Sequence, residues 1–294
     1  MKTVKSRWTE PLVLRLIDKH GNKPPEMVLD TLAEKYLREA GQHRLPVDVE
    51  GIASLLGIRR RLGEHPFAGR IYAEENGQLV MDLNASDSEP RRRFSCAHEI
   101  MHTAFPGFRK ESRYRADPVV ATYNKARGEE EYLCDVGAAA LIMPRSLVEE
   151  IFSFDDGLEA VEELSFEAQV SLEAAGNRLA ALSPEPAIFL VMEVGNKPAD
   201  LPAMRRGEEI PPRLRVRYAV VHGANLYLPK YKSADLDSLF VRALTSREVE
   251  RETAHLPGGP PRLRFEIEAK AFPRQGPEGE IQRVLAVARP FAKR

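Results

Sequence analysis

Two histidines and a glutamate between residues 91 and 107 have the spacing of a metal-dependent hydrolase. The stretch reads RRRFSCAHEIMHTAFPG. His98 and His102 are four positions apart, so on an α-helix both imidazoles lie on one face and can hold one metal ion. Glu99 is offset by about 100° and can reach a water on that ion without binding the ion. We expect zinc to lower the pKa of this water from about 15.7 towards about 7, and Glu99 to act as the general base.

The third ligand must come from another segment, because a catalytic zinc takes three protein ligands and keeps one position open. The helix expected over residues 129–142 offers Glu131, with Glu129 and Glu130 as alternatives. Asp135, one turn after Glu131, can accept a hydrogen bond from the distal nitrogen of a liganding histidine and so fix its tautomer. Nitrogen and carboxylate ligands suit several divalent ions, so Mn²⁺ is an alternative to Zn²⁺.

The segments that must position these residues are expected to be mostly helical. Apolar spacing and terminating glycines or prolines predict the helices. Alternation in GRIYA and QLVMDL, with Asn76-Gly77 between them, predicts a β-hairpin before the motif. Residues 108–128 are polar and basic and are expected to form a long loop. The expected helices cover residues 26–41, 45–57, about 90–105 and 129–142, with two or three more within 146–182.

The sequence changes character after SPEPA, residues 183–187, where we expect a domain boundary. Five segments beyond it read as strands, with one helix near ADLDSLFVRALTS. The fold class is therefore α+β: a mostly helical core with a short β-hairpin, and then a mainly antiparallel sheet. The expected regions are 1–145, a catalytic domain; 146–184, a helical segment; and 185–294, a regulatory domain. The expected strands are AIFLVMEV, RLRVRYAVVH, NLYLPKY, RLRFEIEAKAF and EIQRVLAVARP.

Composition excludes several classes of protein. The 294 residues carry a formal net charge of −1, which argues against a general binder of nucleic acid or of membrane surfaces. The sequence lacks an apolar run of about 18 residues and a usable signal core, so no membrane association is expected. Its 2 cysteines are too few for a disulfide framework and fit a cytoplasmic location.

The motif segments PRRRFSCAHEIMH and EYLCDVGAAALIMP resemble the ImmA/IrrE metallopeptidases, also called the DUF955 group, and most of all the IrrE-like regulators of the stress and DNA-damage response. The resemblance covers about residues 26–182 and becomes thin beyond 187. It implies that His98, His102 and Glu131 bind zinc and that Glu99 is the general base. It also implies a minimal zincin core, a helix-turn-helix-like segment and a C-terminal sensor domain of the GAF-like type.

The same resemblance implies a biological role. Such proteins cleave a helix-turn-helix transcriptional repressor when a stress signal such as DNA damage arrives, which derepresses the genes it held. Some members belong to anti-phage defence clusters. We keep one alternative from another class, a non-catalytic regulator that contains a metal and binds DNA or a repressor directly. A metal-dependent hydrolase of small amides is a weaker alternative, because nothing in the sequence indicates a closed pocket.

Three further residues near the motif have candidate roles. GRIYA is a candidate edge strand for an extended peptide substrate. Tyr72 and His65 are candidates for stabilising the oxyanion, although both also suit ordinary surface or packing positions. Cys134 lies three residues after Glu131 and is a candidate inhibitory ligand, against the simpler reading of a small buried residue.

Basic residues in the C-terminal part suggest an activating ligand. Single-stranded DNA is one candidate, since alternating arginines share a strand face and can follow a phosphate backbone while Tyr218 or Tyr227 stacks on bases. Another kind of ligand and a solvated structural face are the alternatives. Residues 161–182 have the rhythm of a helix-turn-helix, but few groups suited to reading DNA. The candidate arginines are Arg213, Arg215, Arg217, Arg262 and Arg264.

Overall fold

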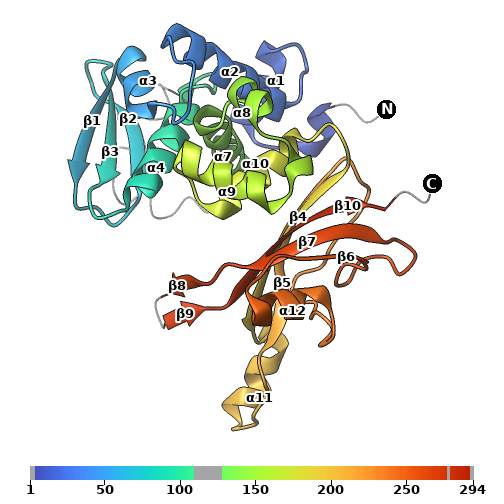
Figure 1. Cartoon of the computed structure of the whole chain (residues 1–294). Helices are drawn as coiled ribbons and strands as arrows, with labels where there is room; N and C mark the ends of the chain where they lie inside the picture. The colour runs from blue at the N-terminus through green and yellow to red at the C-terminus, as the bar shows by residue number, and fades with distance from the viewer. Residues whose placement is uncertain (1–3, 109–127, 277–278, 292–294) are drawn as a thin grey trace. The chain divides into compact units, whose positions relative to one another are not determined.

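The computed structural model describes residues 4–108, 128–276 and 279–291 (Figure 1). Most of the expected loop 108–128 lies outside the described residues. The chain divides into two compact units. The N-terminal unit comprises Met1–Ile151 with Glu167–Val170, and the C-terminal unit comprises Phe152–Phe166 with Ser171–Arg294. The α+β class is confirmed, while the three predicted regions stay predictions.

The N-terminal unit is built on two packed helices and a small sheet. Helix α4 (Glu89–His102) carries the histidine motif and packs against α7 (Gly128–Ile142), α3 (Val49–Leu55) and the sheet. Helix α2 (Pro25–Glu39) packs on α7 as well. The remaining elements of this unit are η1 (Val4–Arg7), α1 (Pro11–Lys19) and α8 (Arg145–Ile151).

Local signals explain where these helices begin and end. Pro25 stands in the first turn of α2, where its missing N–H is not needed. Asp48 caps α3, and its side chain accepts from the Gly51 N–H at 2.8 Å. Helix α4 ends at His102, earlier than Pro106-Gly107 suggested, where the N–H groups of Thr103 and Ala104 donate to the carbonyls three residues earlier in a tighter turn.

The sheet has the order β1-β3-β2. The predicted hairpin is confirmed: β2 (Gly69–Ala73) pairs antiparallel with β3 (Leu79–Asn84). Strand β1 (Ile58–Gly63) pairs with β3 in parallel and was not predicted. Strand β2 is therefore an edge strand. Its buried residues Ile71 and Ala73 lie on one face, and Arg70 and Tyr72 lie on the other.

Helix α7 is buried along most of its length. Gly137 lets α4 approach closely, because a Cβ atom there would lie 2.7 Å from Cγ and 2.9 Å from Sδ of Met101. Leu133, Ala138 and Leu141 are all completely buried. Close contact between α4 and α7 is what brings the histidine motif next to the acidic first turn of α7.

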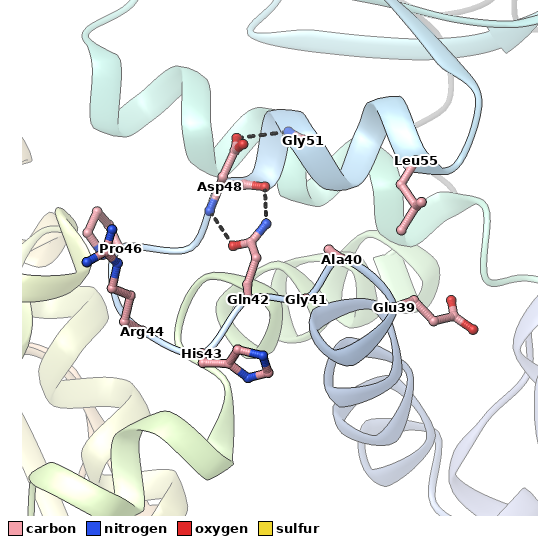
Figure 2. A pocket seen from close by; sticks show the side chains of 10 residues that line it. All are labelled: Glu39, Ala40, Gly41, Gln42, His43, Arg44, Pro46, Asp48, Gly51 and Leu55. Carbon is pink, nitrogen blue, oxygen red and sulfur yellow. Dashed lines mark hydrogen bonds between the residues drawn. The ribbon is translucent and has the colours of Figure 1, made fainter.

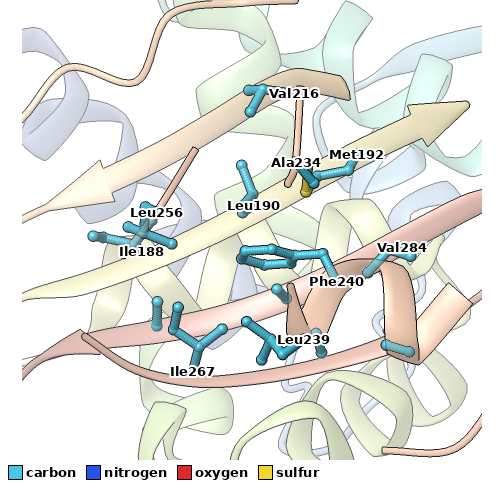
Figure 3. Close-up of a cluster of buried hydrophobic side chains, with 14 of the residues drawn as sticks. Ile188, Leu190, Met192, Val216, Ala234, Leu239, Phe240, Leu256, Ile267 and Val284 are labelled. Atoms are coloured by element: carbon cyan, nitrogen blue, oxygen red, sulfur yellow. The ribbon is translucent and has the colours of Figure 1, made fainter. Parts of the chain in front are cut away.

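The C-terminal unit is a five-stranded antiparallel sheet in the order β5-β4-β10-β7-β6. Helix α12 (Leu239–Ser246) packs on it over a cluster that includes Leu190, Phe240 and Ile267 (Figure 3). Helix α10 (Leu172–Leu182) packs on β4 and β5. The strands are β4 (Ala187–Gly195), β5 (Arg213–His222), β6 (Glu250–Ala254), β7 (Phe265–Ala271) and β10 (Arg283–Pro290).

Smaller elements complete this unit. They are η3 (Phe154–Asp156), η4 (Pro198–Asp200), α11 (Leu201–Arg205), and the hairpin of β8 (Arg274–Gly276) and β9 (Gly279–Ile281). NLYLPKY, which was expected to be a strand, forms no named strand, and β6 was not expected. Among the described residues, no helix combines the length and the apolarity that a membrane span requires.

The helix-turn-helix rhythm corresponds to α9 (Leu158–Ala168) and α10. The groups on α10 that could read DNA are used inside the C-terminal unit. Asn177 donates from Nδ2 to the Tyr218 hydroxyl at 3.4 Å, and Arg178 is buried. Gly176 lies against the ring of Phe189, so α10 packs tightly on the sheet. The helix-turn-helix and GAF-like assignments stay predictions.

Candidate metal centre

The two histidines of α4 face the acidic first turn of α7. Their ring centroids are 5.0 Å apart, with planes inclined at 70°. His98 Nε2 lies 3.2 Å from Glu131 Oε2, and His102 Nε2 lies 3.7 Å from Glu131 Oε1. Ligand nitrogens and oxygens about 2.0–2.2 Å from a tetrahedral zinc are about 3.3–3.5 Å from each other. The three side chains therefore fit a divalent ion placed among these atoms.

Each histidine also has a carboxylate at its other ring nitrogen. His98 Nδ1 lies 2.8 Å from Asp135 Oδ1, the contact that the sequence spacing predicted. His102 Nδ1 lies 2.8 Å from Glu130 Oε1. When Nδ1 carries the proton and donates it to a carboxylate, the Nε2 lone pair faces the ion. Both rings are thus set to present Nε2 to the space beside Glu131.

The charges around His98 favour its protonated form in the metal-free protein. Burial lowers the pKa of His98, but hydrogen bonds to Asp135 and Glu131 outweigh this and raise it to about 10. Burial raises the pKa of Glu131, and the hydrogen bond from His98 outweighs that and holds it below its usual value. A metal ion must therefore displace a proton from His98, while Glu131 is already ionised.

Cys134 also lies close to the histidine pair. One ligand atom each of His98, His102 and Cys134 lie within 4.8 Å of one another. Cys134 is completely buried. We favour Glu131 as the third ligand because its carboxylate is already at ligand-to-ligand distance from both histidines. The role of Cys134 as an inhibitory ligand stays a prediction.

The side chain of Glu99, a residue of α4, lies beside the edge strand β2. Its side chain is 7% exposed. A Cβ atom at Gly69 would lie 3.0 Å from Glu99 Oε1 and 3.1 Å from its Cγ, so the backbone of β2 passes directly beside this carboxylate. The geometry places a carboxylate next to an edge strand that an extended peptide can join.

Tyr72 and His65 have other neighbours. The Tyr72 hydroxyl accepts from Arg61 NH1 at 3.2 Å, on the face of β2 opposite the buried Ile71. The His65 ring stacks on Phe67 with centroids 4.8 Å apart. The structure does not bring these two side chains to the histidine pair, and their oxyanion roles stay predictions.

The candidate arginines are distributed differently from a continuous basic face. Arg215 donates to the Gly195 carbonyl at 3.1 Å and to the Ser233 hydroxyl at 2.7 Å, so it holds loops of the protein itself. Arg217 pairs with Glu193 at 2.6 Å. Arg264 donates to the Thr253 carbonyl. The remaining two candidates, Arg213 and Arg262, are exposed.

Sequence reasoning missed two features of the acidic segment. Glu130 was considered only as an alternative ligand, whereas it lies at the far nitrogen of His102. Glu129 accepts from the Thr9 and Glu10 N–H groups at 2.9 Å and 2.8 Å and so caps α1. Glu10 in turn accepts from the N–H groups of Glu129 and Glu130 at 3.1 Å and 3.0 Å. The run of three glutamates was the available signal, but their directions depend on packing.

A separate pocket of about 630 Å³ lies in the N-terminal unit (Figure 2). Gln42 closes its loop by donating to the Asp48 carbonyl at 3.0 Å and accepting from the Asp48 N–H at 2.8 Å. None of its lining residues belongs to the histidine site. They are Glu39, Ala40, Gly41, Gln42, His43, Arg44, Pro46, Asp48, Gly51 and Leu55.

Known proteins resemble the region that carries this site. Residues 56–180 match the peptidase M78 family, described as the IrrE N-terminal-like domain. The radiation response metalloprotease IrrE of Deinococcus radiodurans is 29% identical over 217 residues, which cover 72% of this chain and 65% of that protein. The radiation response metalloprotease IrrE of Deinococcus deserti is 33% identical over 129 residues, which cover 43% of this chain and 44% of that protein. The chain thus covers less than two thirds of either relative.

A solved structure shares the fold. A Mycobacterium tuberculosis transcriptional regulator matches with a TM-score of 0.55 and 16% identity, over 95% of this chain and 80% of that chain. At this identity the likeness concerns the fold alone.

The family match supports a metallopeptidase-like domain, and the histidine helix that faces an acidic helix beside an edge strand is compatible with it. The region 56–180 is thus similar to the ImmA/IrrE family.

Proposed function

We propose that this protein is a zinc-dependent endopeptidase of the cytoplasm that cleaves a helix-turn-helix transcriptional repressor in response to stress. The observation that carries the proposal is the convergence of His98, His102 and Glu131 with Glu99 nearby. The ligand set also suits Mn²⁺. Two relatives named as radiation response metalloproteases support a stress signal such as DNA damage.

In the proposed mechanism His98, His102 and Glu131 hold the ion from three sides. A bound zinc ion supplies a Lewis acid that acidifies water and polarises the scissile carbonyl. Glu99 takes one proton from the attacking water and gives it to the leaving amide nitrogen as the C–N bond breaks. The products are a carboxylate and an amine, and Glu99 returns to its ionised form.

The substrate is proposed to bind in extended form along β2. An edge strand offers unpaired backbone groups, and an added peptide strand uses them for main-chain hydrogen bonds. Gly69 at the start of β2 adjoins the Glu99 carboxylate, so a peptide on this edge passes the base. Cleavage of the repressor would release its target genes, for stress response or anti-phage defence.

The C-terminal unit is proposed to sense the signal. Single-stranded DNA remains the proposed activating ligand, although fewer of the candidate arginines are available to bind it than the sequence suggested. Arg215 and Arg217 are hydrogen-bonded to other residues of the unit, although Arg217 remains exposed, and Arg213, Arg262 and Arg264 are exposed as well. Tyr227 is 78% exposed and can supply a stacking surface.

A cleavage assay tests the proposal. The helix-turn-helix repressor encoded nearest to this gene is mixed with wild-type protein or Glu99→Gln, with and without single-stranded DNA and with added Zn²⁺ or Mn²⁺. We expect a discrete cut by wild type alone, and Glu99→Gln to keep its metal. Turnover by Glu99→Gln would overturn the role of the base. Repressor or DNA binding without any cut would instead support the non-catalytic regulator.

A further inference from the structure

Glu130 is a buried carboxylate directed at a histidine of the metal centre. The residue has no exposed surface, and His102 is 3% exposed. Glu130 Oε1 lies 2.8 Å from His102 Nδ1. Burying a carboxylate is unfavourable unless hydrogen bonds and nearby positive charge compensate it. Because the burial of this carboxylate is unfavourable, its position next to His102 indicates a specific role.

The equivalent contact of the other histidine is solvated. Asp135 accepts from His98 at the same distance of 2.8 Å, but its side chain is 59% exposed. Water can replace an exposed carboxylate as the partner of an imidazole N–H. In the closed surroundings of His102, loss of Glu130 leaves a buried N–H without this acceptor. The His98–Asp135 and His102–Glu130 contacts therefore have the same length, but water can replace only Asp135.

The main chain of Glu130 is held in place from another part of the N-terminal unit. Glu10 Oε2 accepts from the Glu130 N–H at 3.0 Å, and Glu10 Oε1 accepts from the Glu129 N–H at 3.1 Å. The Glu129 carboxylate in turn accepts from the Thr9 hydroxyl at 2.8 Å. These reciprocal contacts fix the first turn of α7. The carboxylate of Glu130 therefore starts from a defined backbone position.

We propose that Glu130 is a positioning residue for His102. It keeps the proton on Nδ1 and holds the ring so that Nε2 faces the ion, while the buried negative charge offsets part of the charge of the ion. This inference rests on the proposed metal centre. The three consecutive glutamates then have three different roles, because Glu129 caps α1, Glu130 orients a ligand and Glu131 is the ligand.

The test measures zinc affinity of the full chain by competition with a chromogenic chelator. We expect Glu130→Gln to weaken zinc binding by roughly tenfold and Glu130→Ala by roughly 100-fold, since partners of this kind typically contribute 10–100-fold. Asp135→Asn should weaken it less than Glu130→Gln, because water can replace the exposed group. Glu150→Gln, the same charge change at an exposed position of α8, is the control and should bind as wild type does.

A second readout does not require metal. Imidazole ¹⁵N spectra of the metal-free protein report which nitrogen of His102 carries the proton, with His102→Gln to assign the signal. We expect an Nδ1–H in wild type and a mixture of tautomers in Glu130→Gln. The conservative variant keeps the shape of the side chain, so it serves even where Glu130→Ala does not fold.

The outcomes separate the inference from the proposed function. Wild-type zinc affinity in Glu130→Gln, with the His102 tautomer unchanged, overturns the inference and leaves the metal centre standing. Absence of zinc binding by wild type overturns the proposed function, and the His102 tautomer in the metal-free protein then decides whether Glu130 still orients the ring. Weakened binding with a changed tautomer supports the positioning role.

Discussion

Gly69 and Glu99 are in contact across the boundary between the edge strand and the motif helix. A Cβ atom at residue 69 would lie 3.0 Å from the Glu99 carboxylate oxygen, closer than such atoms normally approach. A side chain at residue 69 would therefore make the Glu99 side chain shift by a few tenths of an ångström. Because residue 69 is a glycine, backbone, and not a side chain, borders the base on this side.

Replacing Gly69 with alanine should displace the Glu99 carboxylate by a few tenths of an ångström and slow repressor cleavage by less than about 10²-fold, the effect that a misplacement of about 1 Å can have. Zinc affinity should not change, because the ligands do not contact residue 69. The measurement is kcat in the cleavage assay beside a chelator competition. Gly195→Ala, where an added Cβ meets no atom within 4 Å, is the control. Unchanged kcat in Gly69→Ala would contradict the placement of the base.

A side chain at Gly137 should also be poorly tolerated, and its effect should appear in the stability of the protein. An alanine Cβ would lie 2.7 Å from Met101 Cγ, so α4 and α7 must separate or Met101 must move. We expect Gly137→Ala to lower the free energy of unfolding by about 1–3 kcal/mol, as measured by urea denaturation. Met101→Ala should make room, so the double variant should lose less than the two single losses combined. Strict additivity would show that the two residues are not in contact.

Metal binding should release a proton. His98 has a pKa of about 10 in the metal-free protein, so it is protonated at neutral pH and must lose that proton to bind an ion. Zinc affinity should rise about tenfold per pH unit between about pH 6 and pH 8. Calorimetry in two buffers of different ionisation enthalpy measures the proton directly. Affinity that is independent of pH in this range would show that His98 is already neutral or is not a ligand.

Glu193 should give the C-terminal unit a pH-dependent stability. Burial raises the pKa of Glu193, but hydrogen bonds from Arg217 and Arg274 outweigh this and hold it below the usual 4.5. Because the folded pKa is depressed, the stabilisation is complete above the unfolded pKa and is lost as pH falls through the folded one.

Glu193→Gln should consequently be less stable than wild type at about pH 7, and the difference should shrink at about pH 3. Urea unfolding at both pH values, followed by a probe in the C-terminal unit, measures the difference. A gap of equal size at both pH values would mean that Glu193 acts through packing and not through its charge.

Local spacing predicted the histidine helix, and it predicted that Asp135 would contact one of the two histidines, because positions four apart on a helix share a face. The structure shows that this histidine is His98. Local spacing could not predict that Glu130 faces His102 while Glu131 faces both histidines. That division depends on the distance and angle between α4 and α7, which Gly137 and Met101 set. The periodicity of the sequence does not predict the distance or the angle at which two helices pack.

Two elements of the N-terminal unit were missed for different reasons. Strand β1 contains Arg59, Arg60 and Arg61, and this charged run conceals its alternation. It becomes a strand because β3 pairs with it in parallel. Helix α1 was judged only as a poor signal segment, although Leu12, Val13, Leu16 and Ile17 form a buried helical face.

The arginines of β5 show a different limit. Alternation correctly placed them on a strand, but it does not reveal what faces them. Glu193 on the neighbouring strand neutralises Arg217, and Ser233 holds Arg215. A basic face inferred from one strand thus became a set of cross-strand pairs once its neighbours were known.

The reciprocal hydrogen bonds between the Glu10 region and the start of α7 also have a consequence for folding during synthesis of the chain. Glu10 is 119 positions from Glu129 and 120 positions from Glu130 along the chain. A nascent chain that has emerged only to residue 108 holds both motif histidines, but none of the acidic residues of α7. Such a chain has two of the three proposed ligands, and it does not yet contain the Glu129 carboxylate that accepts from the N–H groups of Thr9 and Glu10 just before α1. Loading of the ion then requires α7 to have been synthesised, and a translation arrest in this interval would yield a product without the third proposed ligand, Glu131.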